Sequence, residues 1–178
     1  MNEKLNIGII LGSTRQGRVS PQVGEWVLKH AESRSNASYE IVDIKDYNLP
    51  LLGEEESDGI LKWNQTLEGF DGFIFVVAEY NHAMTGALKN ALDLARDAWH
   101  NKVAGIVSYG SGYGIRAAEQ LRVVLAELEI ADVRSHVQLS LFHDFKEGVF
   151  TPLNVHQANL TNLYNQVETW GKALKSIR

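Results

Sequence analysis

The chain has 178 residues, of which 44% are apolar, and a formal net charge of −5 without any basic stripe. This size and apolar content predict a single domain, residues 1–178, with a sizeable core, and the charge argues against nucleic acid as the main partner. No apolar run approaches a membrane span, no signal-peptide pattern precedes the first strand, and the absence of cysteine excludes disulfides and thiolate metal sites, so a cytoplasmic location is expected.

Strand-like and helix-like segments alternate along the chain. The predicted strands span residues 5–11, 39–44, 70–78, 103–109 and 133–139. The predicted helices span residues 20–34, 58–68, 84–99, 114–129 and 154–175. The runs at 5–11, 73–78 and 103–107 are almost continuously apolar, which is typical of parallel strands buried on both faces. Right-handed βαβ units then predict an α/β fold, a three-layer sandwich with helices on both faces of a parallel sheet.

The first predicted strand leads directly into a polar loop, Gly12–Ser20, and then into a helix. A helix N-terminus directs unpaired N–H groups and a partial positive charge at an anion. The loop adds three hydroxyl groups and two guanidinium groups, carried by Ser13, Thr14, Ser20, Arg15 and Arg18. Because such donors suit phosphate oxygens, the loop predicts a phosphorylated ligand.

Two other interpretations of this loop are a P-loop and an ordinary turn. Gly12 and Gly17 have the spacing of a P-loop, but Arg18 and Val19 stand where a P-loop has Lys and then Ser or Thr. The hydroxyl that would hold Mg²⁺ is therefore missing, which argues against nucleotide hydrolysis, and the G-x-G-x-x-G pattern is also absent. An ordinary turn with surface arginines remains the alternative, although two arginines and three hydroxyls are more polar groups than such a turn usually contains.

Two more polar loops, Ala78–Gly86 and Tyr109–Gly114, follow the third and fourth predicted strands. Because the carboxyl ends of parallel strands share one edge of a sheet, the three loops predict one ligand site. The second loop offers a ring and backbone amides at Tyr80 and Asn81, and Thr85 is a candidate helix cap. Alternatively, Tyr80 covers the core and Asn81 turns the chain. The glycines of the third loop let the backbone approach a ligand closely, or they make a flexible turn.

Together these motifs resemble the NADPH-dependent FMN reductase family of flavodoxin-like proteins, which includes quinone, azo-dye and chromate reductases. The resemblance covers most of the chain, from residue 5 to residue 150. The matching residues are Gly12-Ser13-x-Arg15 with Ser20, Glu79-Tyr80-Asn81 followed by Leu88-Lys89-Asn90-Ala91-Leu92-Asp93, and the glycine-rich turn after Ser108 followed by Gln120-Leu121-Arg122. Ala78 stands where the family usually has Pro, and Met84-Thr85-Gly86 replaces its more usual Ser-x-x-x-Pro-Gly type of turn.

The resemblance implies a five-stranded parallel sheet of order 2-1-3-4-5 and FMN as the cofactor. It implies that the first loop holds the FMN phosphate, the second loop lies along the isoalloxazine ring, and the third brackets the ring from its other side. The residues implied are Ser13, Arg15, Arg18, Val19 and Ser20 for the phosphate, Glu79, Tyr80, Asn81 and His82 for the ring, and Ser108, Tyr109, Gly110 and Gly112 for its other side.

By the same resemblance the chain is an FMN-dependent NAD(P)H oxidoreductase that passes electrons to quinones, azo compounds, free flavin or similar acceptors by a ping-pong mechanism. The chemistry lies at flavin N5, so no catalytic side chain is expected, and the histidine spacing and lack of cysteine predict no metal site. Either NADPH or NADH could be the co-substrate. A flavodoxin-type electron carrier and a flavin-based redox sensor are the alternatives, and steady-state NAD(P)H oxidation separates them from a reductase.

The resemblance also implies a homodimer or homotetramer in which a second subunit helps to wall the flavin. Trp99, Tyr113 and the predicted helices 84–99 and 114–129 are the candidates for that interface. The alternative for Trp99 is ordinary core packing.

Overall fold

The computed structural model describes residues 4–55, 57–95 and 97–178. The sheet strands are β1 (Leu5–Leu11), β2 (Ala37–Asp43), β3 (Gly72–Ala78), β4 (Lys102–Gly110) and β5 (Ile130–Ser140). They are all parallel and follow the order β2-β1-β3-β4-β5. The predicted α/β class and strand order are therefore confirmed.

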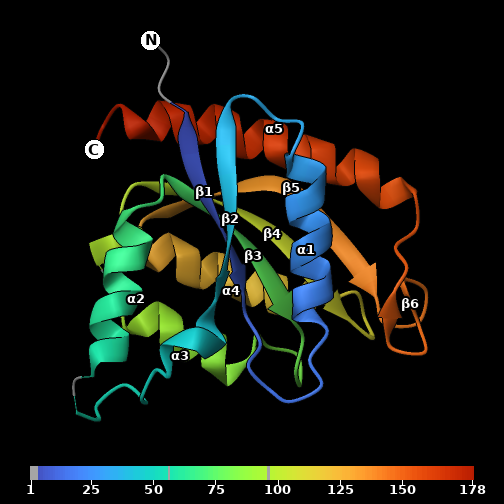
Figure 1. Cartoon of the computed structure of the whole chain (residues 1–178), viewed down its shortest axis with the longest axis horizontal. Helices are drawn as coiled ribbons and strands as arrows, with labels where there is room; N and C mark the ends of the chain where they lie inside the picture. Colours follow the sequence, from blue (N-terminus) through green and yellow to red (C-terminus); the bar gives the residue numbers. More distant parts are fainter. Residues whose placement is uncertain (1–3, 56, 96) are drawn as a thin grey trace.

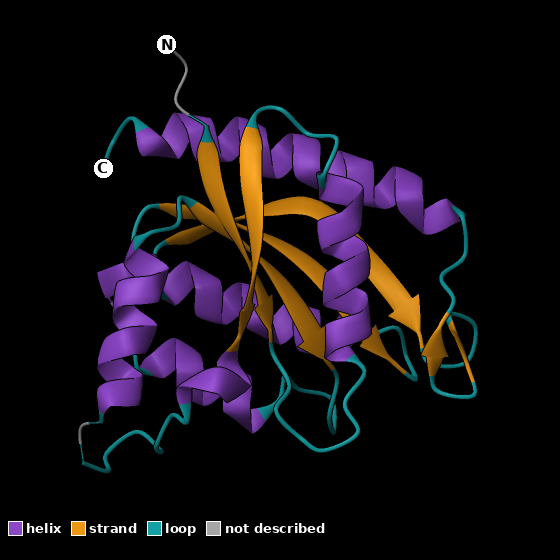
Figure 2. Ribbon diagram, viewed as in Figure 1, coloured by secondary structure: helices purple, strands orange, loops and turns teal. Residues whose placement is uncertain are grey.

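Helices cover both faces of this sheet (Figures 1 and 2). One face carries α1 (Ser20–Ala31) and α5 (Val155–Lys175), and the other carries α2 (Asp58–Glu68), α3 (Gly86–Asp93) and α4 (Ile115–Glu127). Two short 3-10 helices, η1 (Ile44–Tyr47) and η2 (Asp97–Trp99), and a hairpin of β6 (Phe145–Lys146) and β7 (Val149–Phe150) complete the chain. The start of β1 and the end of α5 lie at one edge of the sheet, and the loops that follow β1 and β3 lie at the other (Figure 1).

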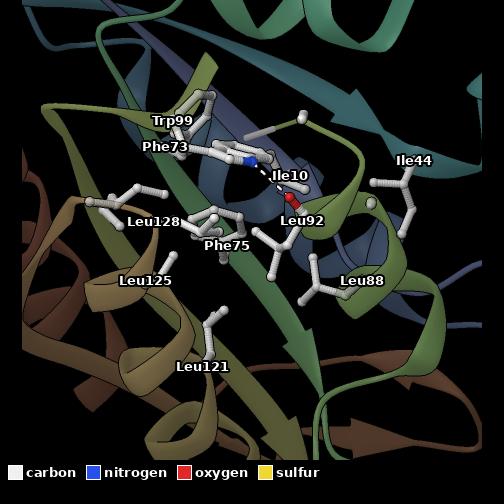
Figure 3. Close-up of a cluster of buried hydrophobic side chains, with 14 of the residues drawn as sticks. Ile10, Ile44, Phe73, Phe75, Leu88, Leu92, Trp99, Leu121, Leu125 and Leu128 are labelled. Atoms are coloured by element: carbon white, nitrogen blue, oxygen red, sulfur yellow. Dashed lines mark hydrogen bonds between the residues drawn. The ribbon is translucent and has the colours of Figure 1, made fainter. Parts of the chain in front are cut away.

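Aromatic rings pack among aliphatic side chains in the core between the sheet and helices α2–α4 (Figure 3). The rings of Phe73 and Trp99 lie 4.9 Å apart, and those of Trp63 and Trp99 lie 6.0 Å apart. Trp99 is fully buried, and its Nε1 donates to the Leu92 carbonyl at 3.0 Å. The expectation that Trp99 lies at a subunit interface is therefore wrong, because the core of its own chain encloses this side chain.

The predicted helix 84–99 is also shorter than expected, since α3 ends at Asp93. Two indole N–H groups bind carbonyl oxygens near the end of α3. Trp63 donates to Ala91 at 2.9 Å, and Trp99 donates to Leu92. These carbonyl oxygens would accept from the next turn if the helix continued. Indole N–H groups from other parts of the fold therefore take the place of that turn. The spacing of apolar residues along the sequence does not indicate these donors.

The sequence did not predict the β6–β7 hairpin, because strands of two residues are too short to show a period of two. Gln22 of α1 holds this hairpin. Its Nε2 donates to the Gly148 carbonyl at 3.0 Å, and its Oε1 accepts from the Phe150 N–H at 2.8 Å. Across the described ranges, no helix is both long and apolar enough to cross a membrane.

Candidate functional site

Three loops meet at the carboxyl edge of the sheet, as predicted. The second and third loops are joined where the Glu79 N–H donates to the Tyr109 carbonyl at 3.0 Å. The first and second loops are joined by Tyr80, whose hydroxyl lies 3.4 Å from Ser13 Oγ. The Arg15 guanidinium also lies over the Tyr80 ring, 5.9 Å from its centroid. The three loops therefore build one surface.

The first turn of α1 contains a buried hydroxyl group without a hydrogen-bond partner of normal geometry. Its N-cap residue, Val19, has no side-chain oxygen, and the turn contains no acidic residue. Ser20 is fully buried, and its Oγ has no hydrogen-bond partner of normal geometry in the part of the chain that the structure describes, although the Tyr109 phenol lies close to both the Ser20 and the Ser13 hydroxyl. A buried polar group of this kind normally has a partner, and the N–H groups of a helix start suit an anion. The turn therefore fits a phosphate group.

The Arg18 guanidinium is bound by groups of the protein itself. Its NH1 donates to the Ser13 carbonyl and to Asp43 Oδ1, both at 2.6 Å, and its NH2 pairs with Asp43 Oδ2. This hydrogen bond with Asp43 raises the pKa of Arg18 above its ordinary value. The guanidinium thus ties the first loop to the end of β2, whereas Arg15 is exposed at the loop surface. Asp43 was absent from the predicted site because nothing in its local sequence pairs it with Arg18.

Two further features shape the first loop. Gly17 has a φ of +70°, a conformation that L side chains rarely adopt. The hydroxyl of Thr85 donates to the Gly12 carbonyl and accepts from the Leu88 N–H at 3.0 Å. Thr85 is therefore the predicted cap of α3, and it also joins that helix to the first loop.

The second loop ends in a two-residue turn. Asn81 and His82 have φ values of 49° and 68°. The N–H of Tyr80 donates to the Ala83 carbonyl at 2.9 Å, and the reverse bond is 3.0 Å long. Two central residues with positive φ are the mark of a type I′ turn. Asn81 does turn the chain, but Tyr80 does not cover the core, since it is 39% exposed.

Helix α4 holds this turn through Arg116. Its Nε donates to Glu79 Oε1 at 2.6 Å, and its backbone N–H donates to Glu79 Oε2 at 3.2 Å, so the carboxylate also caps α4. Arg116 NH1 lies 2.9 Å from His82 Nε2. A guanidinium can only donate, so this His82 nitrogen accepts. Gln120 Nε2 donates to the His82 carbonyl at 2.9 Å. No local motif marks Arg116 as a residue of this site.

The start of the third loop is buried. Ser108 is fully buried, and its hydroxyl donates to the Tyr113 carbonyl at 2.7 Å. Tyr109 is 5% exposed, and burial raises its pKa to about 12, so the phenol stays protonated at neutral pH. Both residues therefore shape the loop from beneath it.

The glycines of the third loop leave room for neighbouring parts of the protein. A Cβ on Gly110 would lie 3.1 Å from Cβ of Glu79. A Cβ on Gly112 would lie 2.9 Å from a guanidinium nitrogen of Arg116. Close packing against the second loop and α4 is thus a reason for these glycines that the sequence did not show.

A parallel sheet with strand order 2-1-3-4-5 and helices on both faces defines a flavodoxin-like fold. The sequence model of the family described as NADPH-dependent FMN reductase matches residues 5–144, and the chain belongs to that family. This result confirms the predicted family and its class, an oxidoreductase that uses FMN and NAD(P)H.

Three known proteins illustrate the relationship. An NAD(P)H-dependent FMN reductase of Schizosaccharomyces pombe is 33% identical over 155 residues, which cover 81% of this chain and 78% of that protein. A quinone reductase of Escherichia coli strain K12 is 26% identical over 187 residues and covers 100% of both chains. The solved structure of FerB, a flavoenzyme NAD(P)H:(acceptor) oxidoreductase from Paracoccus denitrificans, has a TM-score of 0.75 at 19% identity and covers 93% of this chain and 98% of its own.

Proposed function

We propose that residues 1–178 form one FMN-binding domain that oxidises NAD(P)H and reduces quinones, azo compounds, free flavin or similar acceptors. The observation that carries this proposal is the uncapped start of α1, where the buried Ser20 hydroxyl has no hydrogen-bond partner of normal geometry among the described residues. It lies in the loop that also presents the exposed Arg15 guanidinium over Tyr80. Phosphate recognition and an aromatic surface therefore occur side by side.

In this proposal the first loop holds the FMN phosphate. The donors are the hydroxyls of Ser13 and Ser20, the Arg15 guanidinium and the backbone N–H groups of Ser20 and Gln22; Pro21 has no N–H to offer. Arg18 acts indirectly, because its bonds to Asp43 and to the Ser13 carbonyl keep the loop in shape. The ring lies along the second loop, with the third loop on its other side. When bound, FMN supplies the redox chemistry, namely hydride acceptance from NAD(P)H and electron delivery to an acceptor.

The protein contributes position and electrostatics. The turn at Asn81 and His82 is held from both sides, by its own hairpin bonds and by Arg116 and Gln120 of α4. A turn fixed in this way presents its backbone without reorganising when a ligand arrives. No side chain is required as an acid or a base.

We further propose that NAD(P)H and the acceptor use the same surface in turn, because the three loops form a single cluster. Steady-state rates measured over a grid of NAD(P)H and quinone concentrations should then give parallel double-reciprocal lines. Lines that intersect with several acceptors would contradict a shared surface.

A homodimer or homotetramer in the cytoplasm completes the proposal. Tyr113 is 40% exposed beside the third loop and remains a candidate for the subunit interface. Sedimentation velocity of the wild type and of Tyr113→Asp tests this part, because a purely monomeric wild type would remove the proposed interface.

The central test is an absorption spectrum of the purified protein before and after addition of FMN, followed by NAD(P)H oxidation with a quinone. A bound flavin spectrum and multiple turnovers support a reductase. Bound flavin without NAD(P)H turnover would instead indicate an electron carrier or a redox sensor.

A further inference from the structure

Three polar side chains, one buried and two partly buried, lie beneath the third loop. Ser108 of β4 is paired in register with Gln138 of β5. Side chains alternate between the faces of a strand, so His136 shares a face with Gln138. His136 Nε2 lies 2.7 Å from Ser108 Oγ, and its Nδ1 lies 3.3 Å from Gln138 Nε2. The three side chains therefore form a line beneath the loop.

The direction of each hydrogen bond in this line follows from the number of protons that each group can donate. Ser108 has a single hydroxyl proton, and it goes to the Tyr113 carbonyl, which can only accept. His136 must therefore donate its Nε2–H to Ser108 Oγ. Its Nδ1 is then the acceptor for the amide N–H of Gln138. Burial and the charge of Arg122 lower the pKa of His136 to about 4, which agrees with a neutral ring.

The line ends on a constrained turn. Tyr113 and Gly114 have φ values of 62° and 70°, so two successive residues are left-handed just before α4. A left-handed residue other than glycine persists only where its surroundings hold it. The bonds that hold Tyr113 are the one from its N–H to the Gly110 carbonyl, 3.2 Å long, and the one from Ser108 to its own carbonyl.

We propose that His136 is a positioning residue for the flavin site, which acts through Ser108 to hold the Tyr113 turn and thereby the third loop against the FMN ring. His136 itself does not touch the cofactor in this scheme. The inference rests on the proposed function, because it assigns the third loop to the ring.

The test compares His136→Leu, which removes the donor, with His136→Gln, whose amide N–H can replace Nε2–H. In the wild type we first measure FMN affinity by fluorescence titration and the visible circular dichroism of the bound flavin. We expect His136→Leu to weaken FMN binding about tenfold, the usual worth of one hydrogen bond, and to change the dichroism. His136→Gln should restore both readouts to near wild-type values.

Ser108→Ala provides an independent test of whether Ser108 and His136 act together. If the two residues act in series, the double variant Ser108→Ala/His136→Leu should bind FMN about as weakly as either single variant. Additive losses would show that the two residues do not act as one line. If His136→Leu fails to fold, His136→Gln and Ser108→Ala decide the question.

The outcomes separate this inference from the proposed function. A wild type that binds no FMN overturns the proposed function. A wild type that binds FMN while His136→Leu and Ser108→Ala keep its affinity and dichroism overturns only the role of His136, even if their melting temperatures fall.

Discussion

The two edges of the sheet use polar groups in opposite ways. At the amino edge, Glu168 accepts from Arg34 NH2 at 2.9 Å, from Tyr39 at 2.7 Å and from Asn36 at 3.2 Å, so both of its carboxylate oxygens have partners. At the carboxyl edge, the Ser20 hydroxyl is buried but has no hydrogen-bond partner of normal geometry in the described ranges. A complete cluster stabilises the fold, whereas an incomplete one fits a ligand that completes it.

A second cluster at the amino edge follows the same rule. Asp71 accepts from the Asn6 N–H at 2.9 Å, from Lys175 at 3.1 Å and from Arg178 at 2.7 Å. The carboxyl edge instead contains the constrained turns of the second and third loops, where Asn81, His82 and Tyr113 are left-handed. The comparison predicts that the amino-edge clusters can be perturbed without affecting the proposed ligand loops, and that the exposed groups of those loops can be changed without a large loss of stability.

The largest effect on stability is expected at the amino edge. Arg34→Leu leaves the mostly buried Glu168 carboxylate without its charged partner, which should cost about 3 kcal/mol of unfolding free energy. Urea denaturation of the apo protein measures this loss. The control is Lys89→Leu, which removes an exposed helical ion pair with Asp93 and should cost about 0.5 kcal/mol. Equal losses in the two variants would show that the buried cluster adds no stability.

Arg15→Ala tests the opposite edge. It should weaken FMN binding by about 2 kcal/mol, because a charge-assisted hydrogen bond to a dianionic phosphate is lost. The apo protein should unfold as the wild type does, because Arg15 is exposed. Flavin titration measures the loss, with Arg134→Ala, another exposed arginine, as the control. Unchanged affinity in Arg15→Ala would mean that the phosphate binds elsewhere.

Tyr80→Ala tests whether this residue at the carboxyl edge affects acceptor choice rather than stability. The ring is 39% exposed, so its loss should change apo stability by about 1 kcal/mol or less. Catalytic efficiency with three different quinones should change in rank order, because the ring lines the surface where acceptors approach. A large fall in apo melting temperature with an unchanged ranking would make Tyr80 a packing residue.

The smallest effect is expected in the pH dependence of stability at acidic pH. Burial raises the pKa of Glu168, but the hydrogen bonds from Arg34, Tyr39 and Asn36 outweigh it, and the net pKa is below its ordinary value of 4.5. Glu168 therefore adds stability above that ordinary pKa and loses it as the pH falls through the folded-state pKa. Melting temperatures from pH 7 to pH 3 should fall less steeply for Glu168→Gln than for the wild type. Parallel curves would contradict this linkage.

The sequence by itself was sufficient for the features that depend on local pattern. Continuous apolar runs marked β1, β3 and β4, and polar glycine-containing segments marked the three loops that meet at the carboxyl edge. Thr85 was recognisable as a helix cap because capping depends on the next three residues. These strands, loops and the helix cap depend on residues that are close in the sequence. They can therefore be predicted without knowing which distant segments come into contact.

Only the tertiary structure decided which of those groups are bound within the protein and which stay exposed. Arg18 looked like a phosphate donor, but its partner Asp43 lies 25 residues away, at the end of another strand. Glu79 is engaged by Arg116, 37 residues further along the chain. Trp99 could have lain at an interface or in the core, and the fold buried it. Hydrogen bonds and burial depend on which segments the fold brings together, and a local sequence pattern does not contain that information.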